Sequence, residues 1–431
     1  AFVLRMDSAG APVWSTYFGG WGSEFWMGLA VDTTCNVVLC GATMGGGLPI
    51  DSAWQSTLGG LQDGFVAKFS PTGTRLWATY LGGYDFDNIL SVGTDDAGCI
   101  YGVGSTVSGN FPVQRAWQSQ YGGGDRDLVY IKFTPAGRLV FASYFGGVGM
   151  EEERGIAVAS DGQFVLSGWN EDGDFPIMNA WQPSFGGVRD AVLARFDSGG
   201  APLWSTYYGG NRVDESRAMC WDAGGNLLIA GRTTSLDFPV LRASQGVIGG
   251  EDDAFVAKFH GAGTPIWCTY FGGSKADELY GLTSDHDGDV LVVGTTYSRD
   301  LPVLHAAYPA MKDPASAAVA HDAFVAKFDS TAGVLWATYF GGSGFDDAFA
   351  AACDSLGHLY VCGGTQSADF PTFDAVQDSL RIMSPVQISQ DAFIARFDAD
   401  GTIPVTLALF TAVRVAEGVE LAAIAPNVVV K

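Results

Sequence analysis

The chain has 431 residues, of which 47% are hydrophobic and 16% are charged, a balance that excludes an intrinsically disordered protein. Its formal net charge of −24 disfavours binding to nucleic acid or to anionic membranes. No apolar run reaches the roughly 18 residues needed to span a bilayer, so membrane insertion is not expected.

The N-terminus, "AFVLRMDSAG", has the alternation of a strand and lacks the charged start, apolar centre and cleavage site of a signal peptide. We therefore expect a processed chain or a fragment. The segment "VWSTYFGG" follows from Val13, and this aromatic segment recurs along the chain. Its tyrosines are Tyr17, Tyr80, Tyr144, Tyr207, Tyr270 and Tyr339, separated by 63, 64, 63, 63 and 69 residues. A fixed period of this kind predicts a repeat architecture.

Between two aromatic segments the same elements appear in the same order. A short strand, a polar turn and an apolar strand come first, as in "AVDTTCNVVLCGAT" from Ala30. A loop marked by a proline follows, and then an alternating strand such as "DAFVAKF" from Asp253. The loop prolines are Pro49, Pro112, Pro176, Pro239, Pro302 and Pro371.

Each repeat is therefore predicted to form four antiparallel strands, with one long loop between its second and third strands. A sheet of four strands cannot bury both faces alone, but sheets packed around an axis can. The sequence thus predicts an all-β fold, a β-propeller of four-stranded blades.

The aromatic segment is expected to fill the space between blades with its Trp and Tyr rings. Phe141 replaces the tryptophan in one copy, so we expect the slot to need a ring rather than an indole N–H. The Gly-Gly pair is expected to let the chain turn with positive φ, without a Cβ clash.

Charged residues follow the repeat as well. An acid lies four residues after each second glycine, at Glu24, Asp87, Glu151, Asp214, Asp277 and Asp346. The third strand carries a cation in every copy, at Arg5, Lys68, Lys132, Arg195, Lys258, Lys327 and Arg396. We expect these charges to satisfy one another, or nearby backbone, where blades meet. An acidic ring lining one face is the alternative.

The stretch "DAFVAKFDSTAGVLWATYFGGSGFDDAFAAACDSLGHLYVCGGTQSADFPT" closely resembles the SBBP repeat, the bacterial seven-bladed β-propeller repeat. The resemblance covers residues 1–410 and implies a secreted or cell-surface bacterial protein with no shared catalytic activity. Six full repeats span residues 28–410, and the first 20 residues supply two outer strands, so seven blades are expected. Residues 411–431 are expected to form a hairpin that closes the last blade. Alternatively, they begin the Ig-like or fibronectin-like segment that precedes C-terminal sorting domains in Bacteroidetes-type secreted proteins.

Few residues point to catalysis or to cofactors. The five histidines share no repeat position, and no hydrolase, zinc or phosphate-loop motif is convincing. Asp285, Asp287 and Asp289 alternate around a glycine and form a weak candidate for a Ca²⁺ site. The ordinary polar turn between strands one and two is the favoured interpretation. The seven cysteines are expected to be buried free thiols; pairing of Cys353 with Cys362 or Cys35 with Cys40 is the alternative.

Loops are the better candidates for function, because a rigid scaffold displays them. The loops from Pro302 and Pro371 to the next strand span 20 residues instead of 14 or 15, which suggests a local lip or an assembly contact, or mere drift in length. Tryptophans recur in the loops at Trp54, Trp117 and Trp181. A structural cover over the blade edge is favoured for them, with sugar stacking as the alternative.

These patterns favour a non-enzymatic extracellular module for binding, adhesion or assembly in a larger bacterial surface protein. Its partner would be protein (another copy or another surface protein) or glycan, and no cofactor is expected. The alternative is a polysaccharide-directed hydrolase or lyase with its site at the mouth of a central channel. Non-repeating polar residues gathered at that mouth would favour the enzyme.

Overall fold

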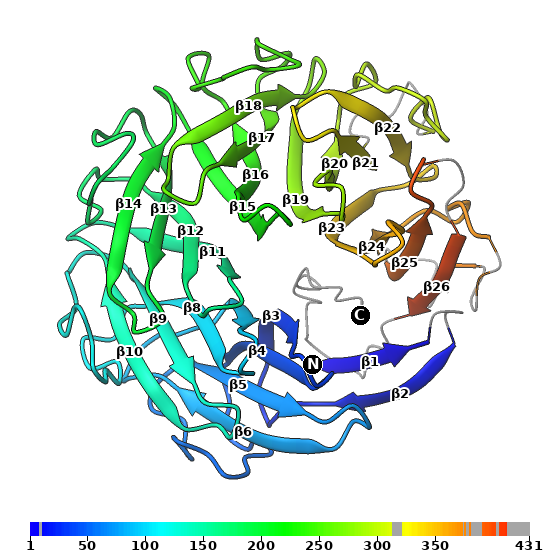
Figure 1. Cartoon of the computed structure of the whole chain (residues 1–431). Helices are drawn as coiled ribbons and strands as arrows, with labels where there is room; N and C mark the ends of the chain where they lie inside the picture. Colours follow the sequence, from blue (N-terminus) through cyan, green and yellow to red (C-terminus); the bar gives the residue numbers. More distant parts are fainter. Residues whose placement is uncertain are drawn as a thin grey trace. The chain divides into compact units, whose positions relative to one another are not determined.

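The computed structural model describes residues 1–7, 11–312, 321–373, 375, 379–380, 390–401 and, for the backbone, 405–411. Within these residues the protein is built from strands and contains no helix (Figure 1). Accordingly, no helix of the described residues is long and apolar enough to cross a membrane. The chain divides into two compact units, Ala1–Arg5 with Pro12–Ser216 and Met6–Ala11 with Arg217–Lys431.

Six four-stranded antiparallel sheets follow one another along the described chain, each with its strands in chain order. The first three are β3 (Glu24–Val31) to β6 (Arg75–Leu81), β7 (Ser91–Thr94) to β10 (Leu139–Phe145) and β11 (Glu151–Val158) to β14 (Pro202–Tyr208). The others are β15 (Asp214–Trp221) to β18 (Pro265–Phe271), β19 (Asp277–Ser284) to β22 (Val334–Phe340) and β23 (Asp346–Cys353) to β26 (Val405–Thr411).

The inner pairs of strands are β4 (Val37–Thr43) with β5 (Asp63–Phe69), β8 (Ile100–Thr106) with β9 (Asp127–Phe133), β12 (Phe164–Asn170) with β13 (Asp190–Phe196), β16 (Leu227–Thr233) with β17 (Asp253–Phe259), β20 (Val290–Thr296) with β21 (Asp322–Phe328) and β24 (Leu359–Thr365) with β25 (Asp391–Phe397). The proline loop joins these two strands in every sheet. The predicted order of four strands per repeat is therefore confirmed, and we call the sheets blades one to six.

The expected seventh blade is not supported by the described residues. The strands β1 (Phe2–Met6) and β2 (Pro12–Tyr17) form a separate sheet of only two strands. They are the two outer strands that the sequence predicts. Past Thr411, the predicted hairpin of residues 411–431 lies outside the described residues, so six complete blades are what the structure supports.

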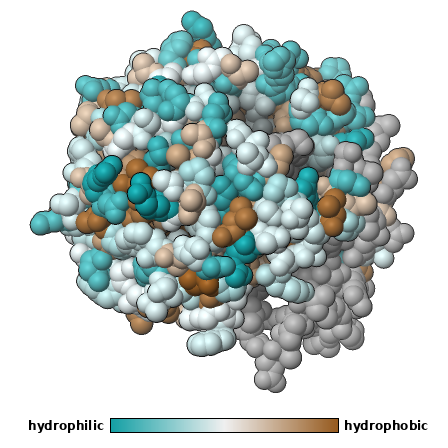
Figure 2. Space-filling model, turned by 60° about the horizontal axis from the view of Figure 1, so that its bottom comes forward, coloured by the Kyte–Doolittle hydropathy of each residue, from teal (hydrophilic) through white to brown (hydrophobic). Residues whose placement is uncertain are grey.

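Adjacent blades of a unit bury their faces against each other, because strand alternation gives every blade two apolar faces. In the first unit, Val38 and Val66 of blade one pack in a single cluster with Ile100 and Ile131 of blade two. In the second unit, Leu228 of blade four shares a cluster with Val292 and Phe324 of blade five. This packing confirms the all-β propeller prediction. On the face that Figure 2 shows, hydrophobic residues form separate spots among polar ones.

The indole N–H of the aromatic segment is used, contrary to expectation. Trp77 Nε1 donates to the Pro135 carbonyl oxygen at 3.0 Å, in the turn between the third and fourth strands of the following blade. Trp267 Nε1 donates to Ser330 in the same way at 2.9 Å. Where Phe141 replaces the tryptophan, the hydroxyl of Tyr130 donates instead to Gly200 in that turn, at 2.8 Å.

The Gly-Gly pairs are needed because there is no room for a Cβ atom. A positive φ is not the reason, since neither Gly82 nor Gly83 adopts one. A Cβ on Gly82 would lie 2.6 Å from Asp63 Oδ1, and one on Gly83 would lie 2.4 Å from Asn110 Oδ1. The expected Cβ clash is therefore confirmed, and the expected left-handed turn is wrong.

Candidate functional site

The acids that follow the Gly-Gly pairs are buried in every copy except Glu24, which is partly buried, and they bond to nearby backbone and hydroxyl groups. Asp87 Oδ2 accepts the N–H of Gly83 at 2.7 Å and the Ser108 hydroxyl at 2.9 Å. Asp277 accepts the N–H of Gly273 and the Ser298 hydroxyl, both at 2.7 Å. The expectation that these acids satisfy backbone is thus confirmed, whereas no ion pair joins them to the third-strand lysines described next.

The third-strand lysines pair with a different acid, in the turn between strands one and two of their own blade. Lys68 Nζ lies 2.9 Å from Asp32 Oδ2, and Lys258 Nζ lies 2.7 Å from Asp222 Oδ2. Burial alone would raise the pKa of Asp32, but hydrogen bonds from Asn36, Lys68 and Thr34 outweigh burial and hold that pKa well below its usual range.

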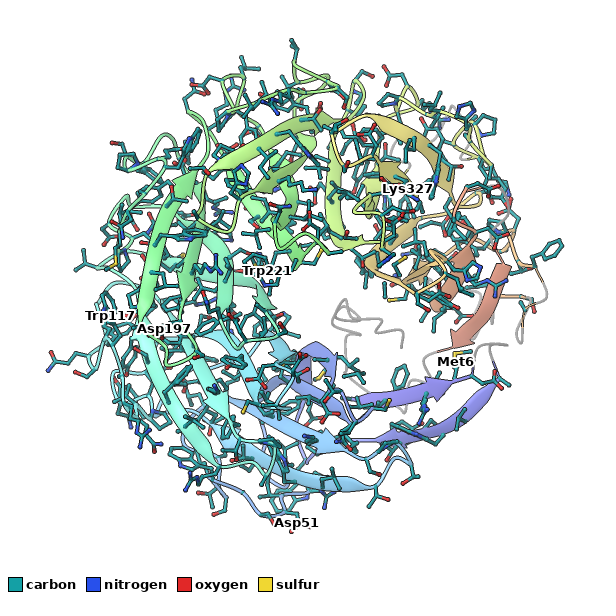
Figure 3. The ribbon with its side chains drawn as sticks, viewed as in Figure 1. Met6, Asp51, Trp117, Asp197, Trp221 and Lys327 are labelled. Carbon is teal, nitrogen blue, oxygen red and sulfur yellow. The ribbon has the colours of Figure 1, made fainter. Side chains whose placement is uncertain are left out.

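The calcium candidate belongs to this class of lysine-paired turns. Lys327 Nζ, labelled in Figure 3, lies 2.8 Å from Asp285 Oδ2 and 3.2 Å from Asp289 Oδ2. Asp285 Oδ1 accepts the backbone N–H groups of Asp287 and Asp289, both at 3.0 Å. In the described part of the chain, no three His, Cys, Asp or Glu side chains form a group suited to a metal ion. The ammonium supplies the positive charge here, so the Ca²⁺ prediction gains no support.

Pairs of buried carboxyl groups meet where two blades join. Burial, with the charge of Asp174 adding to it, raises the pKa of Asp127 to about 7 and of Glu151 to about 8. Asp127 Oδ1 and Glu151 Oε2 have no hydrogen-bond partner among the described residues. A Cβ on Gly146 would lie 2.9 Å from the first oxygen and 2.6 Å from the second. Protonation of these carboxyl groups would remove the cost of burying their charges.

Polar side chains that break the repeat gather where the first strands begin. In the first unit, Arg189 pairs with Glu171 and Glu215, and its guanidinium lies 3.8 Å from the Trp169 ring centroid. In the second unit, Glu278 accepts hydrogen bonds from Arg217 Nη1 and the Tyr280 hydroxyl, both at 2.6 Å.

These polar clusters occur on some blades and not on others. The positions equivalent to Glu215 and Glu278 are Phe25 in blade one and Asn88 in blade two. Each arginine of the clusters already contacts a carboxylate, so a substrate would have to displace an ion pair to use it. The alternative of an enzymatic site rests on these clusters.

The loop between strands two and three is fixed to its own blade by a glutamine. Gln55 Nε2 donates to Asp63 Oδ2 at 2.8 Å, and Gln55 Oε1 accepts the N–H of Gly82 at 3.1 Å. Gln182 makes the equivalent bonds in blade three. The loop tryptophans therefore stand on a rigid base.

These tryptophans cover the blade with one face only. The rings of Trp117 and Phe145 have centroids 5.3 Å apart, and those of Trp181 and Tyr208 lie 5.7 Å apart. Trp54, Trp117 and Trp181 are nevertheless 40%, 46% and 43% exposed. Trp117 lies at the periphery of the first unit in Figure 3. The ring contacts agree with the structural cover, and the exposed faces leave sugar stacking open.

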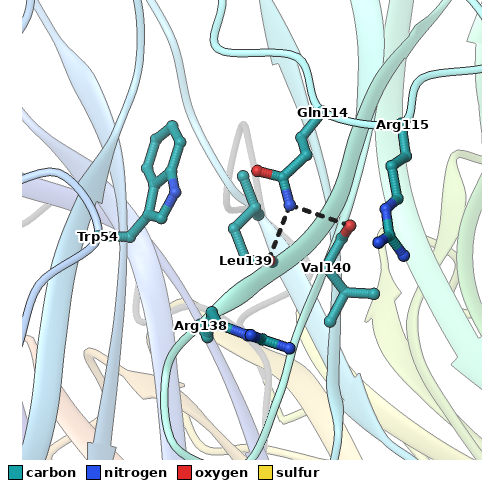
Figure 4. Close-up of a pocket in the computed structure, with 6 residues that line it drawn as sticks. All are labelled: Trp54, Gln114, Arg115, Arg138, Leu139 and Val140. Atoms are coloured by element: carbon teal, nitrogen blue, oxygen red, sulfur yellow. Dashed lines mark hydrogen bonds between the residues drawn. The ribbon is translucent and has the colours of Figure 1, made fainter.

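One loop tryptophan borders a recess between blades one and two, both in the first unit. We call it the Trp54 recess; it has a volume of about 230 Å³ and is lined by Trp54, Gln114, Arg115, Arg138, Leu139 and Val140 (Figure 4). Gln114 Nε2 donates to the carbonyl oxygens of Leu139 at 2.9 Å and Val140 at 3.2 Å. Figure 4 places the indole on one side and the Arg115 guanidinium on the other. Sequence reasoning found Trp54 but missed the arginines, which lie far from it in the chain.

A second recess in the same unit is acidic. Its volume is about 360 Å³, and Asp125, Asp172 and Asp174 line it. Asp172 Oδ2 accepts the N–H of Met150 at 3.0 Å, and Asp174 accepts that of Val148. Asp172 and Asp174 thus each accept a backbone N–H and stabilise the turn from Val148 to Met150.

Cysteines and histidines contribute no further site. All seven cysteines are free, which confirms the expected thiols, but only Cys40, Cys268 and Cys362 are buried, Cys35 is exposed, and the other three are partly buried. His358 Nδ1 contacts Asp354 at 2.8 Å within a strand-one to strand-two turn. Much of the two longer loops lies outside the described residues, so the predicted lip or assembly contact stays a prediction.

Comparison with known proteins leaves the family open. No protein-family model matches the chain, so the SBBP resemblance stays a prediction. The chain is 20% identical to WD repeat-containing protein L264 of Acanthamoeba polyphaga mimivirus, over 92% of this chain and 33% of that protein. It is 28% identical to the regulatory protein FlaEY of Caulobacter vibrioides, over 40% of this chain and 18% of that protein. The chain thus spans a third or less of the length of these relatives.

Solved structures with some likeness are all distant. A Hadza microbial sialidase aligns with 80% of this chain and 63% of its own, at 11% identity and a TM-score of 0.43. An aldose sugar dehydrogenase from Streptomyces coelicolor aligns with 84% of this chain and 92% of its own, at 14% identity and a TM-score of 0.37. Sqt1 from Chaetomium thermophilum aligns with 91% and 88%, at 11% identity and a TM-score of 0.40.

Proposed function

We propose that the chain is a non-enzymatic β-propeller module that binds a partner outside the cell, as part of a larger bacterial surface protein. The observation that carries the proposal is the Trp54 recess, in which an exposed indole and two arginines line one hollow. Neither Arg115 nor Arg138 has an ion-pair partner among the described residues. Exposed aromatic and charged side chains without partners, carried on loops that are fixed to a rigid sheet, are typical of a binding surface.

The placement in a larger surface protein rests on the SBBP resemblance and on the short share of the relatives that the chain spans. In the same proposal, the two-stranded sheet β1–β2 is completed to a seventh blade by strands that the described residues do not include. Figure 2 offers no broad apolar face on the side it shows, which favours a polar partner such as glycan over a large protein interface there.

A polysaccharide-directed hydrolase or lyase is the second candidate, favoured by buried carboxyl groups at positions that break the repeat. Burial raises the pKa of Glu153 to about 7. The equivalent residues of blades one and two are Trp26 and Ile89, so this acid is not part of the repeat. Burial likewise raises the pKa of Asp252, the partner of Arg232 at 2.8 Å, to about 7. A carboxyl group with such a pKa is a suitable general acid.

A glycan array followed by product analysis distinguishes the candidates. We expect the chain to retain at least one class of polysaccharide and to release neither new reducing ends nor unsaturated sugars from it. Turnover that is lost in Glu153→Gln would favour the enzyme. Retention of no glycan, together with self-association in sedimentation, would replace glycan binding by assembly.

A further inference from the structure

We infer that the Trp54 recess binds a uronic-acid residue of an acidic polysaccharide, holding the sugar carboxylate with Arg115 and Arg138. This inference rests on the proposed function as a binding module and names the ligand class of that same site. It requires a ligand with a negative charge and an apolar ring face close together, which the next three features specify.

The charge of the recess is the first feature. The chain has 23 lysines and arginines against 47 acids, so most of its cations have acids to pair with. Arg126 and Arg154, which belong to the same unit, both contact Glu152. In contrast, the side chains of Arg115 and Arg138 are exposed and lack a carboxylate partner among the described residues. A guanidinium group binds a planar carboxylate through two parallel hydrogen bonds, so a ligand carboxylate fits this gap.

The aromatic and amide groups are the second feature. The exposed face of Trp54 can support the apolar face of a pyranose ring, because an indole is a large amphipathic surface. Gln114 uses its Nε2 for two backbone carbonyls. Its Oε1 receives no hydrogen bond from the described residues and can accept one from a sugar hydroxyl.

The backbone beneath Arg115 is the third feature. Arg115 has φ 46°, a left-handed conformation that is uncommon for a long side chain. The equivalent residues of blades one, three, four and five, Ser52, Asn179, Arg242 and His305, also have positive φ. Because serine, asparagine and histidine also make this turn, the turn itself does not require the arginine of blade two.

Size and net charge limit the affinity. At about 230 Å³ the recess is smaller than the roughly 300–1,000 Å³ of a pocket that encloses a small molecule. It therefore holds one ring of a longer chain. The net charge of −24 repels a polyanion at long range. At about 0.15 M salt, the screening length of about 8 Å removes most of that repulsion but not the contacts inside the recess.

The test compares binding of an alginate hexasaccharide, a neutral glucan hexasaccharide and a sulfated glucan hexasaccharide by calorimetry. We expect the wild-type chain to prefer alginate, and both Trp54→Ala and the double variant Arg115→Asn with Arg138→Ala to lose about tenfold or more in affinity. The double variant gives blade two the asparagine and alanine that blade three has at the equivalent positions, Asn179 and Ala201, so the fold is expected to persist. Trp117→Ala is the matched control and should bind alginate as the wild type does.

Each other result contradicts the inference. Alginate binding that survives both variants would place the site elsewhere and leave the binding module standing. Preference for the neutral glucan would show that the recess does not recognise a negative charge. Equal binding of the sulfated glucan would show that it does not select a carboxylate. If no saccharide binds at all, the inference fails, and the proposed function then depends on a protein partner.

Discussion

Two blade junctions of the first unit have a similar backbone conformation in the proline loop but carry different side chains on their surface. The first junction, between blades one and two, carries Arg115 and Arg138, while the second, between blades two and three, has Asn179 and Ala201 at the equivalent positions. The φ angles of Arg115 and Asn179, 46° and 48°, are nearly the same. Each junction also has a half-exposed tryptophan. The comparison teaches that repeated residues hold the blades together, whereas residues that vary between repeats determine what a junction can bind.

The largest effect is expected from substituting the glycine that both junctions pack against buried carboxylates. Gly82→Ala at the first junction and Gly146→Ala at the second place a Cβ within 2.6 Å of a carboxylate oxygen. We expect each substitution to lower the free energy of unfolding by about 3 kcal/mol, since the buried acids cannot move aside. Chemical denaturation measures the effect. Gly246→Ala, where a Cβ would meet no atom within 4 Å, is the control and should leave stability unchanged.

The pH dependence of stability should separate the two junctions. The folded pKa is about 8 for Glu151 at the second junction and about 6 for Asp63 and Asp87 at the first, all raised above the ordinary value. A raised carboxyl pKa means that the folded state binds the proton more tightly than the unfolded state does. Its contribution to stability is therefore full below the ordinary pKa and is lost as the pH rises through the folded pKa.

We therefore expect the second junction to lose stability up to about pH 8, and the first only up to about pH 6. The loss is on the order of 5 kcal/mol for Glu151 and on the order of 3 kcal/mol for each acid of the first junction, because the pKa of Glu151 is raised further. Glu151→Gln should reduce the loss above pH 6 but not abolish it, because the amide does not ionise whereas Asp127, with a pKa of about 7, still does. Unfolding titrations at a series of pH values check this. If the free energy of unfolding changes with pH in the same way in wild type and variant above pH 6, the pKa of Glu151 is not raised.

A smaller effect concerns the donor that links each blade to the next. Trp77→Phe at the first junction removes the N–H that bonds Pro135 and should cost about 1 kcal/mol. At the second junction Phe141 is native and Tyr130 supplies the donor, so Tyr130→Phe should cost a similar amount. Thermal denaturation of both variants measures the cost. Stability unchanged in both would mean that only the rings matter.

The smallest effect distinguishes the two loop tryptophans. Trp117→Ala removes a ring pair with Phe145 and should lower stability by about 1 kcal/mol, whereas Trp54 has no such aromatic partner among the described residues. We expect Trp54→Ala to cost less than half as much in the same denaturation measurement. A larger cost for Trp54→Ala would make that residue a structural cover like Trp117.

The repeat made the blades predictable from sequence. Four elements in fixed order, with period-two alternation in segments such as Asp253–Phe259, determine the strands and their order. The partners of the repeated charges were not predictable, because Lys68 reaches Asp32 in a turn 36 residues earlier, while the expected partners bond to glycine N–H groups. The hydroxyl of Tyr130 supplies the donor that Phe141 lacks only because neighbouring strands place both rings beside the turn at Gly200.

Only part of the candidate site could be predicted from the sequence. Trp54 was evident from its recurrence, but Arg115 and Arg138 come from a different blade, and only packing brings them to the same recess. Their lack of ion-pair partners among the described residues is likewise a property of the folded chain. In a repeat protein, such surface combinations of neighbouring blades carry no periodic signal.

A crystal structure of the chain with bound alginate hexasaccharide tests the central claim most directly. The account predicts density for one sugar ring over Trp54 at the first junction, with its carboxylate between Arg115 and Arg138. Density for the sugar over Trp117 at the second junction, or over the arginine–glutamate clusters of the first strands, would contradict it.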